Sequence, residues 1–226
     1  MWIKICANTN LADAQLAASL GADALGFVFA PSARQVTVEQ VAAITPHLPH
    51  AIETFAVVQS HNLDEIVEIV RKTGVTGVQL HGGLDLALAR RLYIALDGRV
   101  RLIQTLHWSV EDDGASATAL ADALHALADE PAIAHVLIDA KVGKASGGTG
   151  RGFNWSAARA VLQAAGAADG KKNVILAGGL HAENVAKAIQ TLAPWGIDVA
   201  SGVEAVPGRK DPQRLERFIA AARGKD

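Results

Sequence analysis

The sequence predicts a single α/β domain over residues 1–226, folded as a closed (β/α)₈ barrel (TIM barrel). Short β-branched or apolar runs alternate with longer Ala/Leu-rich segments of helical period, and this alternation occurs eight times. The short runs are almost continuously apolar, as expected for strands of a parallel sheet covered on both faces. An open doubly wound sheet is the other architecture built from such units. The count of eight and the lack of a Gly-x-Gly-x-x-Gly motif after the first strand favour the barrel.

The pattern places each strand before a helix. Strands are predicted at Trp2–Cys6, Ala24–Phe29, Glu53–Val58, Gly77–Leu80, Arg101–Thr105, Val136–Ile138, Val174–Ala177 and Ile197–Ala200. The helices that follow them are predicted at Leu11–Leu20, Val38–Pro46, Leu63–Lys72, Leu84–Leu96, Ala117–Ala128, Trp155–Ala164, Ala182–Leu192 and Pro212–Arg223.

Several of these boundaries carry capping signals. Thr37 and Gln40 have the spacing of a capping box, in which each side chain bonds the other residue's backbone N–H. Asp211 before Pro212 is a typical helix start. The longest irregular stretches are expected at His107–Ser116 and Lys141–Gly152, and the Gly, Lys and Ser content of the second predicts a mobile lid.

Composition excludes several classes of partner. The formal net charge is −2, from 21 basic and 23 acidic residues without a basic tract, so neither nucleic acid nor an anionic membrane surface is an expected partner. Cys6 is the single cysteine, which rules out an internal disulfide and suits a reducing compartment. The first ten residues lack a secretory pattern, and no apolar run could span a bilayer. We therefore expect a soluble cytoplasmic protein.

Two glycine-containing turns predict a phosphate site. In barrels of this kind, ligands bind at the C-terminal ends of the strands, and phosphate often binds after the seventh and eighth strands. Here the seventh strand leads into Gly178-Gly179, and the eighth into Ser201-Gly202. Glycine lets backbone N–H groups approach an anion, and a following helix N-terminus favours negative charge. Either pair alone could be an ordinary tight turn, but the two together favour phosphate.

Further polar residues fall at strand ends on the same side of the barrel. Each has an ordinary structural explanation, such as a buried small residue for the cysteine, a helix cap for an aspartate or a structural hydrogen bond for a histidine. The first and sixth strands flank the seventh and eighth, however, so a substrate anchored by phosphate could meet Cys6 and Asp139. A thiolate and a carboxyl group facing one substrate are suited to proton transfer. The other polar residues at strand ends are Gln79, His81 and Asp198.

The chain resembles the phosphoribosylanthranilate isomerase family over almost its whole length. The matching blocks, in the family's order, are Lys4-Ile5-Cys6; Gly21-Ala22-Asp23-Ala24-Leu25-Gly26-Phe27-Val28-Phe29; Gly77-Val78-Gln79-Leu80-His81-Gly82; Leu137-Ile138-Asp139-Ala140; Gly147-Gly148-Thr149-Gly150; Leu176-Ala177-Gly178-Gly179-Leu180 with Glu183-Asn184-Val185; and Asp198-Val199-Ala200-Ser201-Gly202-Val203-Glu204.

The resemblance implies an Amadori rearrangement in tryptophan biosynthesis. N-(5-phosphoribosyl)anthranilate opens to an iminium, loses its C2′ proton and ends as an aminodeoxyribulose phosphate. Asp139 is implied as the general acid and Cys6 as the general base, with no metal and no organic cofactor, in a monomer or homodimer. This chemistry requires a Cys6 pKa below the free value of about 8.5 and an Asp139 pKa above about 3.9. Lys4, two residues from Cys6 on the same strand, shares its face and is expected to assist the thiolate.

Four positions depart from the family pattern. Ala7 replaces the usual glycine after the cysteine, which we expect to be tolerated only with a negative φ. In the motif after the second strand, Gln35 stands where the family's carboxylate-binding arginine is expected, and Arg34 is its neighbour. The end of the third strand and Asn154 also differ.

These differences leave three functions open. The chain could be an active isomerase with a rebuilt carboxylate contact, a sugar-phosphate isomerase with a different aglycone, or a non-catalytic protein that binds a phosphorylated metabolite or a partner protein. The intact pair of Cys6 and Asp139 argues against the last. The position of the Arg34 side chain relative to the barrel mouth is the observation that bears most on the choice.

Overall fold

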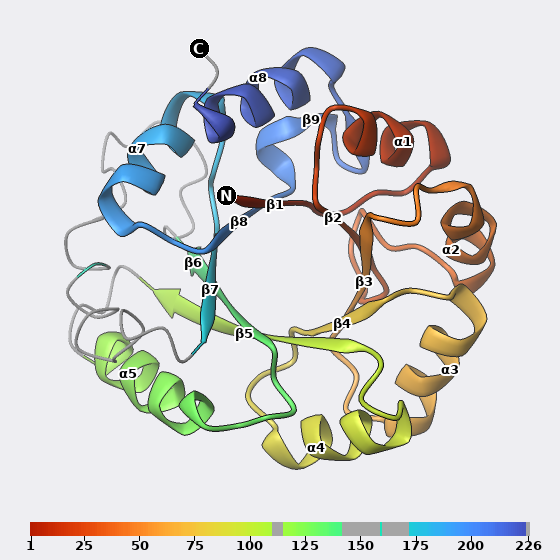
Figure 1. Ribbon diagram of the computed structural model, residues 1–226, viewed down its shortest axis with the longest axis vertical. Coiled ribbons are helices and arrows are strands. Elements are labelled where there is room, and N and C mark those ends of the chain that lie inside the picture. The colour runs from red at the N-terminus through yellow and green to blue at the C-terminus, as the bar shows by residue number, and fades with distance from the viewer. Residues whose placement is uncertain (110–114, 142–158, 160–171, 225–226) are drawn as a thin grey trace.

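Eight parallel strands close into a barrel in the computed structural model, which describes residues 1–109, 115–141, 159 and 172–224 (Figure 1). The strands pair in chain order, and β8 returns to β1, which confirms the predicted (β/α)₈ architecture. Their bounds are β1 Trp2–Ile5, β2 Ala24–Val28, β3 Glu53–Val58, β4 Gly77–Leu80, β5 Arg101–Ser109, β6 His135–Lys141, β7 Asn173–Ala177 and β8 Gly196–Val199.

The helices form the outer ring around these strands (Figure 1). In the described parts of the chain they are α1 Leu11–Ser19, α2 Val38–Ile44, α3 Leu63–Thr73, α4 Leu86–Ala95, α5 Ala115–Ala128, α7 Ala182–Leu192 and α8 Pro212–Arg223. The helix predicted at Trp155–Ala164 lies outside the described residues, Arg159 excepted, as does the predicted lid beyond Lys141. None of the described helices is long and apolar enough to cross a membrane.

Local signals set the helix boundaries. The Thr37 hydroxyl accepts a bond from the Gln40 N–H at 3.3 Å, and the Gln40 side chain accepts one from the Thr37 N–H at 2.8 Å, as predicted for a capping box. Asp211 caps α8 by accepting two backbone bonds at 3.0 Å. Helix α2 ends at Ile44, two residues before the predicted end, and a 3₁₀ turn at Thr45–His47 contains the proline that interrupts it.

Two apolar clusters explain why the barrel is solid. Residues on the outward faces of the strands pack against the helices, whereas alternate residues such as Phe55, Leu137 and Ile175 form a separate cluster inside the barrel. Gly77 is required beside Phe55, because a Cβ at that position would lie 2.2 Å from the phenyl ring. Because side chains fill the interior, the space for a ligand lies at the ends of the barrel.

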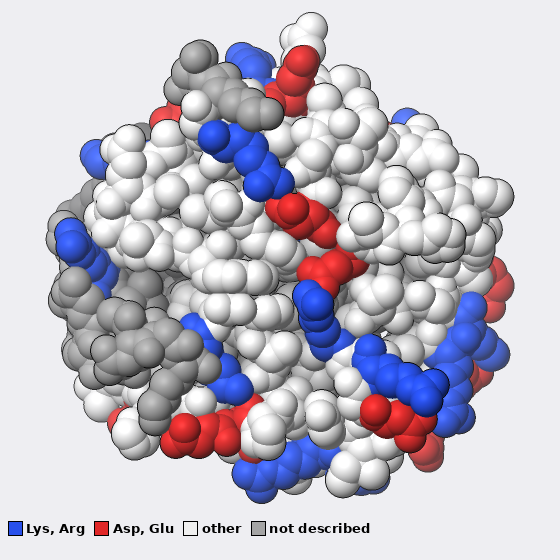
Figure 2. Space-filling view, in the orientation of Figure 1, with Lys and Arg blue, Asp and Glu red and all other residues white. Residues whose placement is uncertain are grey.

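The structure adds two features near the C-terminal ends of the strands that the pattern did not predict. Strand β5 continues through Ser109, beyond the predicted end at Thr105, so the first part of the expected irregular stretch is strand. An antiparallel pair, β9 Glu204–Val206 and β10 Arg209–Lys210, lies between β8 and α8. On the face shown in Figure 2, acidic and basic residues are interspersed.

Candidate active site

A cavity of about 380 Å³ opens at the C-terminal ends of the strands, where the sequence predicted the site. It is lined by most of the predicted site residues, which come from six different strand ends and the loops after them. These residues are Cys6, Arg34, Gln79, His81, Asp139, Gly178, Gly179, Asp198 and Ser201. Gly202 lines a neighbouring pocket with Ser201, Arg214 and Arg217, and Gln35 lines neither pocket.

The buried lysine of β1 connects the candidate base to a carboxylate on β8. Lys4 is fully buried, lies beside Asp198 in the β1–β8 register, and its Nζ is 2.8 Å from Asp198 Oδ1. Glycine at position 26 of β2 makes room for this arrangement, because a Cβ there would lie 2.7 Å from Cys6 Sγ and 3.0 Å from Lys4 Nζ. The predicted shared face of Lys4 and Cys6 is therefore confirmed.

The expectation of a lowered pKa for Cys6 is wrong. Burial raises the pKa of the thiol, and the Asp198 carboxylate raises it further, while Lys4 and Lys210 oppose both effects. For Lys4 itself, burial disfavours the charged form, but Asp198 and Cys6 outweigh it and raise the lysine pKa. Lys4 is thus a permanent cation beside the thiol.

Two imidazoles face the candidate acid. His81 Nε2 lies 3.7 Å and His107 Nδ1 lies 3.6 Å from Asp139 Oδ2. The two imidazole rings pack edge to face, with their centroids 4.7 Å apart. Burial raises the pKa of Asp139, but the two histidines together outweigh burial and hold this pKa well below its ordinary value. The predicted upward shift, which followed from the need for a protonated acid, is therefore wrong, because the two imidazoles favour the ionised carboxylate.

His107 was missed because the sequence interpretation ended the fifth strand at Thr105. In β5, His107 lies beside Asp139 of β6. It is two residues beyond Thr105, and the Thr105 hydroxyl accepts a hydrogen bond from the Gln79 side chain inside the barrel at 3.1 Å. The sequence does contain a signal for His107. Alternate residues of a strand share a face, so His107 continues the period of two that runs through Ile103 and Thr105.

The backbone after β1 adopts a conformation that alanine was not expected to tolerate. Ala7 has a φ of 62°, in the left-handed region, although alanine was expected to need a negative φ. An L-residue there costs roughly 1–2 kcal/mol. Side chains hold the turn: Asn8 donates to the carbonyls of Ile5 at 2.8 Å and Gly26 at 3.3 Å.

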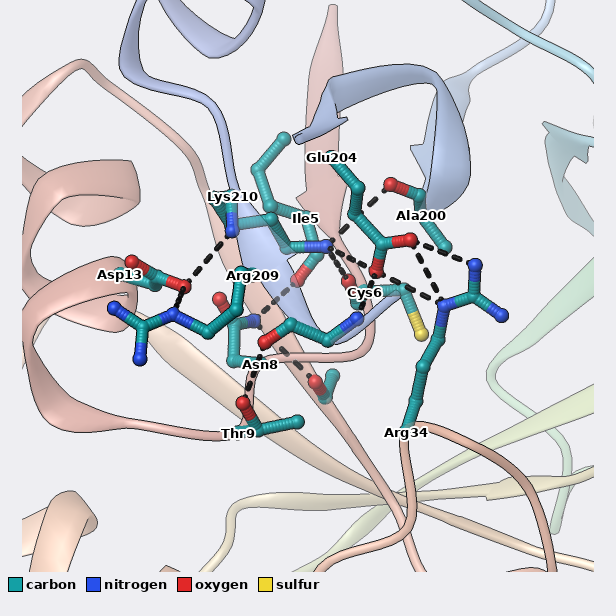
Figure 3. Close-up of polar contacts among 12 residues, drawn as sticks. Ile5, Cys6, Asn8, Thr9, Asp13, Arg34, Ala200, Glu204, Arg209 and Lys210 are labelled. Atoms are coloured by element: carbon teal, nitrogen blue, oxygen red, sulfur yellow. Dashed lines mark hydrogen bonds and ion pairs between the residues drawn. The ribbon is translucent and has the colours of Figure 1, made fainter. Parts of the chain in front are cut away.

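A buried lysine of the β9–β10 hairpin also holds this turn (Figure 3). Lys210 Nζ donates to the Cys6 carbonyl at 2.5 Å and lies 3.5 Å from Glu204 Oε1. Glu204 in turn accepts bonds from Arg34, with Nε at 2.9 and 3.0 Å and Nη2 at 2.7 Å. The sequence pattern gives no role to Glu204 or Lys210, because only the hairpin brings them to Cys6.

The structure answers which residue after β2 faces the cavity. The Arg34 side chain lines it, beside Cys6 in Figure 3, whereas Gln35 is exposed and donates its amide to the Phe29 carbonyl at 3.1 Å. Gln35 therefore does not line this cavity, although the motif placed it at the carboxylate contact. An arginine is present at the mouth after all.

The turns after β7 and β8 have the backbone shape that their glycines predict. Gly178 and Gly179 have φ values of 94° and 63°, in the left-handed region. A Cβ on Gly202 would lie 1.9 Å from the Leu180 carbonyl oxygen, so the two turns pack in direct contact. Asn184 in the first turn of α7 donates to the Gly179 carbonyl at 2.9 Å and secures the first of them.

Comparison with known proteins agrees with this geometry. Residues 3–221 match the family described as N-(5'-phosphoribosyl)anthranilate (PRA) isomerase. The N-(5'-phosphoribosyl)anthranilate isomerase of Pelobacter propionicus is 40% identical over 222 residues, which cover 98% of this chain and 95% of the relative. That of Bacillus cereus is 35% identical over 221 residues and 98% of each chain.

Solved structures of the same kind superpose over nearly the whole chain. Phosphoribosyl anthranilate isomerase from Thermotoga maritima has a TM-score of 0.81 and 31% identity, with 99% of each chain covered. A phosphoribosyl anthranilate isomerase in complex with reduced 1-(o-carboxyphenylamino)-1-deoxyribulose 5-phosphate has a TM-score of 0.78 and 29% identity, again over 99% of each chain. The chain belongs to the N-(5'-phosphoribosyl)anthranilate isomerase family.

Proposed function

We propose that this protein catalyses the Amadori rearrangement of N-(5'-phosphoribosyl)anthranilate to 1-(2-carboxyphenylamino)-1-deoxyribulose 5-phosphate in tryptophan biosynthesis. The observation that carries the proposal is that Cys6 and Asp139 line one cavity together with the turns after β7 and β8 and with Arg34. One cavity therefore combines four groups that this substrate requires. The base and the acid serve its reacting carbons, and the anion-binding backbone and the guanidinium serve its two charged ends.

The phosphate end is assigned to Gly178, Gly179, Ser201 and Gly202. Positive φ values turn the backbone of the first two glycines, and helix α7 begins three residues beyond Gly179. Backbone N–H groups and a helix N-terminus together favour a bound phosphate. Gly202 contributes by its lack of a side chain, which lets the turn after β8 approach the turn after β7.

The anthranilate carboxylate is assigned to Arg34. Arg34 Nε donates to both Glu204 oxygens and Nη2 donates to Oε2, so the guanidinium has a defined orientation, and we assign Nη1 to the substrate carboxylate. Charge-assisted bonds from a guanidinium are among the stronger polar contacts. This assignment favours an aglycone with a carboxylate over the alternative of a different aglycone.

Proton transfer is assigned to two residues. Asp139 donates a proton to the ribose ring oxygen as the C1′–O bond breaks and the nitrogen lone pair forms the C1′=N iminium. The Cys6 thiolate then removes the C2′ proton, and the electrons of the C–H bond neutralise the iminium to give an enaminol. Transfer of a proton from the 2′-hydroxyl to C1′ completes the ketone, so the substrate neither gains nor loses protons overall.

The pKa directions of Asp139 and Cys6 define what the bound substrate must change. Asp139 is ionised beside its imidazoles, so the proton that it delivers enters through the cluster of Asp139, His81 and His107. The Cys6 thiol has a raised pKa, and an iminium formed next to it favours the thiolate because opposite charges within a few ångströms stabilise each other. Lys4 adds a fixed positive charge from the same strand.

Purified protein tests the proposal by the loss of anthranilate-type fluorescence when phosphoribosylanthranilate is added. Cys6→Ser and Asp139→Asn should each lower kcat strongly, whereas His125→Gln, an exposed change on α5, should not. Absence of turnover at high enzyme concentration would exclude the isomerase. A melting shift with inorganic phosphate and none with the isomerase product would instead support a non-catalytic binding protein. A cytoplasmic location and a monomer or homodimer without nucleic acid remain predictions.

A further inference from the structure

We propose that His81, His107 and Asp139 form a zinc-binding site at the cavity mouth, and that Zn²⁺ bound there inhibits the enzyme. These three residues each offer one ligand atom, and the atoms lie within 4.8 Å of one another. Their chemistry, two imidazole nitrogens and one carboxylate oxygen, matches the ligand types that Zn²⁺ takes in proteins.

The distances in the cluster suit a bridging cation better than direct hydrogen bonds. The two nitrogens are 3.7 and 3.6 Å from Asp139 Oδ2, longer than an ordinary hydrogen bond. Two ligands of a tetrahedral zinc, each about 2.1 Å from the metal, are roughly 3.4 Å apart. The two distances from the imidazole nitrogens to Asp139 Oδ2 are therefore close to the separation that a shared zinc ion requires.

The barrel supplies the three ligands from rigid neighbouring strands. His107 of β5 lies directly beside Asp139 of β6 in the strand register. His81 directly follows β4, and its backbone N–H donates to the Val58 carbonyl at 2.8 Å, which extends the hydrogen bonding of the barrel beyond the strand. Sites built on strands keep their geometry, so little conformational entropy opposes binding of the metal.

The site is open to solvent in the way that an inhibitory ion requires. The side chains of His81, His107 and Asp139 are 23%, 37% and 22% exposed. Three protein ligands leave a fourth coordination position for water or for an oxygen of a bound ligand. Zinc can therefore enter from the cavity mouth without opening the barrel.

Inhibition follows from the proposed role of Asp139 and rests on that proposal. A carboxylate oxygen bonded to Zn²⁺ cannot carry the proton needed by the ribose ring oxygen. Zinc binding itself does not depend on this role, so binding and inhibition can be measured separately.

Binding is tested on the full chain without substrate. Zinc affinity is measured by calorimetry, and Co²⁺ is used as a spectroscopic probe, since tetrahedral coordination gives strong visible d–d bands. We expect one equivalent to bind, and His81→Gln and His107→Gln should each weaken binding at least about tenfold, as loss of a ligand exceeds loss of an outer-shell partner. His61→Gln is the matched control, because His61 pairs with Asp85 at 3.3 Å outside the cluster.

The nearby Cys6 thiol is the main alternative ligand for the zinc ion. Cys6 lines the same cavity and is itself a zinc-type ligand, so Cys6→Ser is included. The proposed site predicts unchanged affinity in that variant and no thiolate-to-cobalt charge-transfer band in the near ultraviolet. Loss of binding in Cys6→Ser, unchanged binding in His107→Gln, or no binding at all would overturn the proposal.

Inhibition has its own readout. Zn²⁺ should slow turnover of the wild-type protein, chelation by EDTA should restore it, and His107→Gln should shift the inhibitory concentration upward by the same factor as the binding constant. A protein that binds zinc but has no isomerase activity would contradict the proposed function and leave the metal site standing. An active protein that is insensitive to zinc would overturn the inhibition.

Discussion

Glu204 holds the guanidinium of Arg34 through three hydrogen bonds of 2.7 to 3.0 Å, across 170 positions of sequence. The carboxylate comes from β9 and the guanidinium from the loop after β2. Burial disfavours the ionised carboxylate, but Arg34, Lys210 and the Gly208 N–H outweigh it and lower the pKa of Glu204. The pair therefore stays charged and presents one face of Arg34 to the cavity.

Substitution of this pair should act on substrate binding. We expect Glu204→Gln and Arg34→Lys each to raise KM by about 10- to 100-fold with a smaller change in kcat, because each removes charge-assisted bonds of about 1.5–3 kcal/mol. Steady-state kinetics measures this. Gln35→Ala is the neighbouring control and should change neither parameter, since Gln35 is exposed. A large effect of Gln35→Ala would return the carboxylate contact to that position.

The Lys4 cation should set the titration of Cys6. Lys4→Met removes the positive charge that opposes the effects of burial and Asp198 on the thiol. The pKa of Cys6 should rise further, and kcat should fall. The measurement is the rate of alkylation by iodoacetamide as a function of pH, which reports the thiolate fraction.

A double substitution separates that electrostatic effect from folding. Lys4→Met alone leaves Asp198 buried without its 2.8 Å partner and should cost about 3–5 kcal/mol of unfolding free energy. Lys4→Met with Asp198→Asn should recover much of this stability. The alkylation profile of the double variant should lie closer to that of the wild type than the profile of Lys4→Met does, because the Asp198 charge that raises the Cys6 pKa is removed as well. An alkylation profile of Lys4→Met identical to that of the wild type would show that Lys4 acts on folding alone.

The contact between the turns after β7 and β8 requires glycine at position 202. Gly202→Ala should lower the melting temperature and raise KM, because the added Cβ meets the Leu180 carbonyl oxygen at 1.9 Å and must separate the two turns that we propose bind phosphate. Gly196→Ala tests strain elsewhere in β8, since its Cβ would meet the Trp2 ring at 2.8 Å at the opposite end of the strand. That variant should lose stability while keeping KM near the wild-type value.

A buried histidine at the N-terminal end of the barrel should make stability depend on pH. His135 stacks on Trp195 with ring centroids 4.5 Å apart, and neither ring nitrogen has a hydrogen-bond partner among the described residues. Burial, with smaller effects from Arg101 and Lys172, lowers its pKa from 6.5 to about 4. Between these values the unfolded chain binds more protons than the folded protein, so stability falls as pH decreases.

Chemical unfolding across that pH range measures the effect. The loss from pH 7 to pH 4 should approach about 3 kcal/mol for this residue at most. His135→Phe keeps an aromatic ring against Trp195 and should flatten the dependence, whereas the exposed His125→Phe should not. Equal slopes for the wild type and His135→Phe would contradict the assignment.

Local pattern determined the architecture of this protein and the position of its site. Hydrophobic period and capping signals such as Thr37 with Gln40 act within a few residues, so they can be recognised in the sequence alone. The parallel barrel then brings the ends of β1, β6, β7 and β8 to one mouth. Cys6, Asp139 and three of the predicted phosphate residues meet there as expected. Glycines such as Gly178 have left-handed backbone where turns need it.

Only the tertiary structure decided which side chains of the mouth act on one another. Arg34 and Gln35 are adjacent in sequence, and the turn after β2 directs one into the cavity and the other to solvent. His107 joined the site because β5 is longer than its apolar run. The pKa directions of Cys6 and Asp139 differed from expectation because a pKa sums burial and every nearby charge. Apart from Lys4, the charges on these two groups come from residues that are close in space and far apart in sequence.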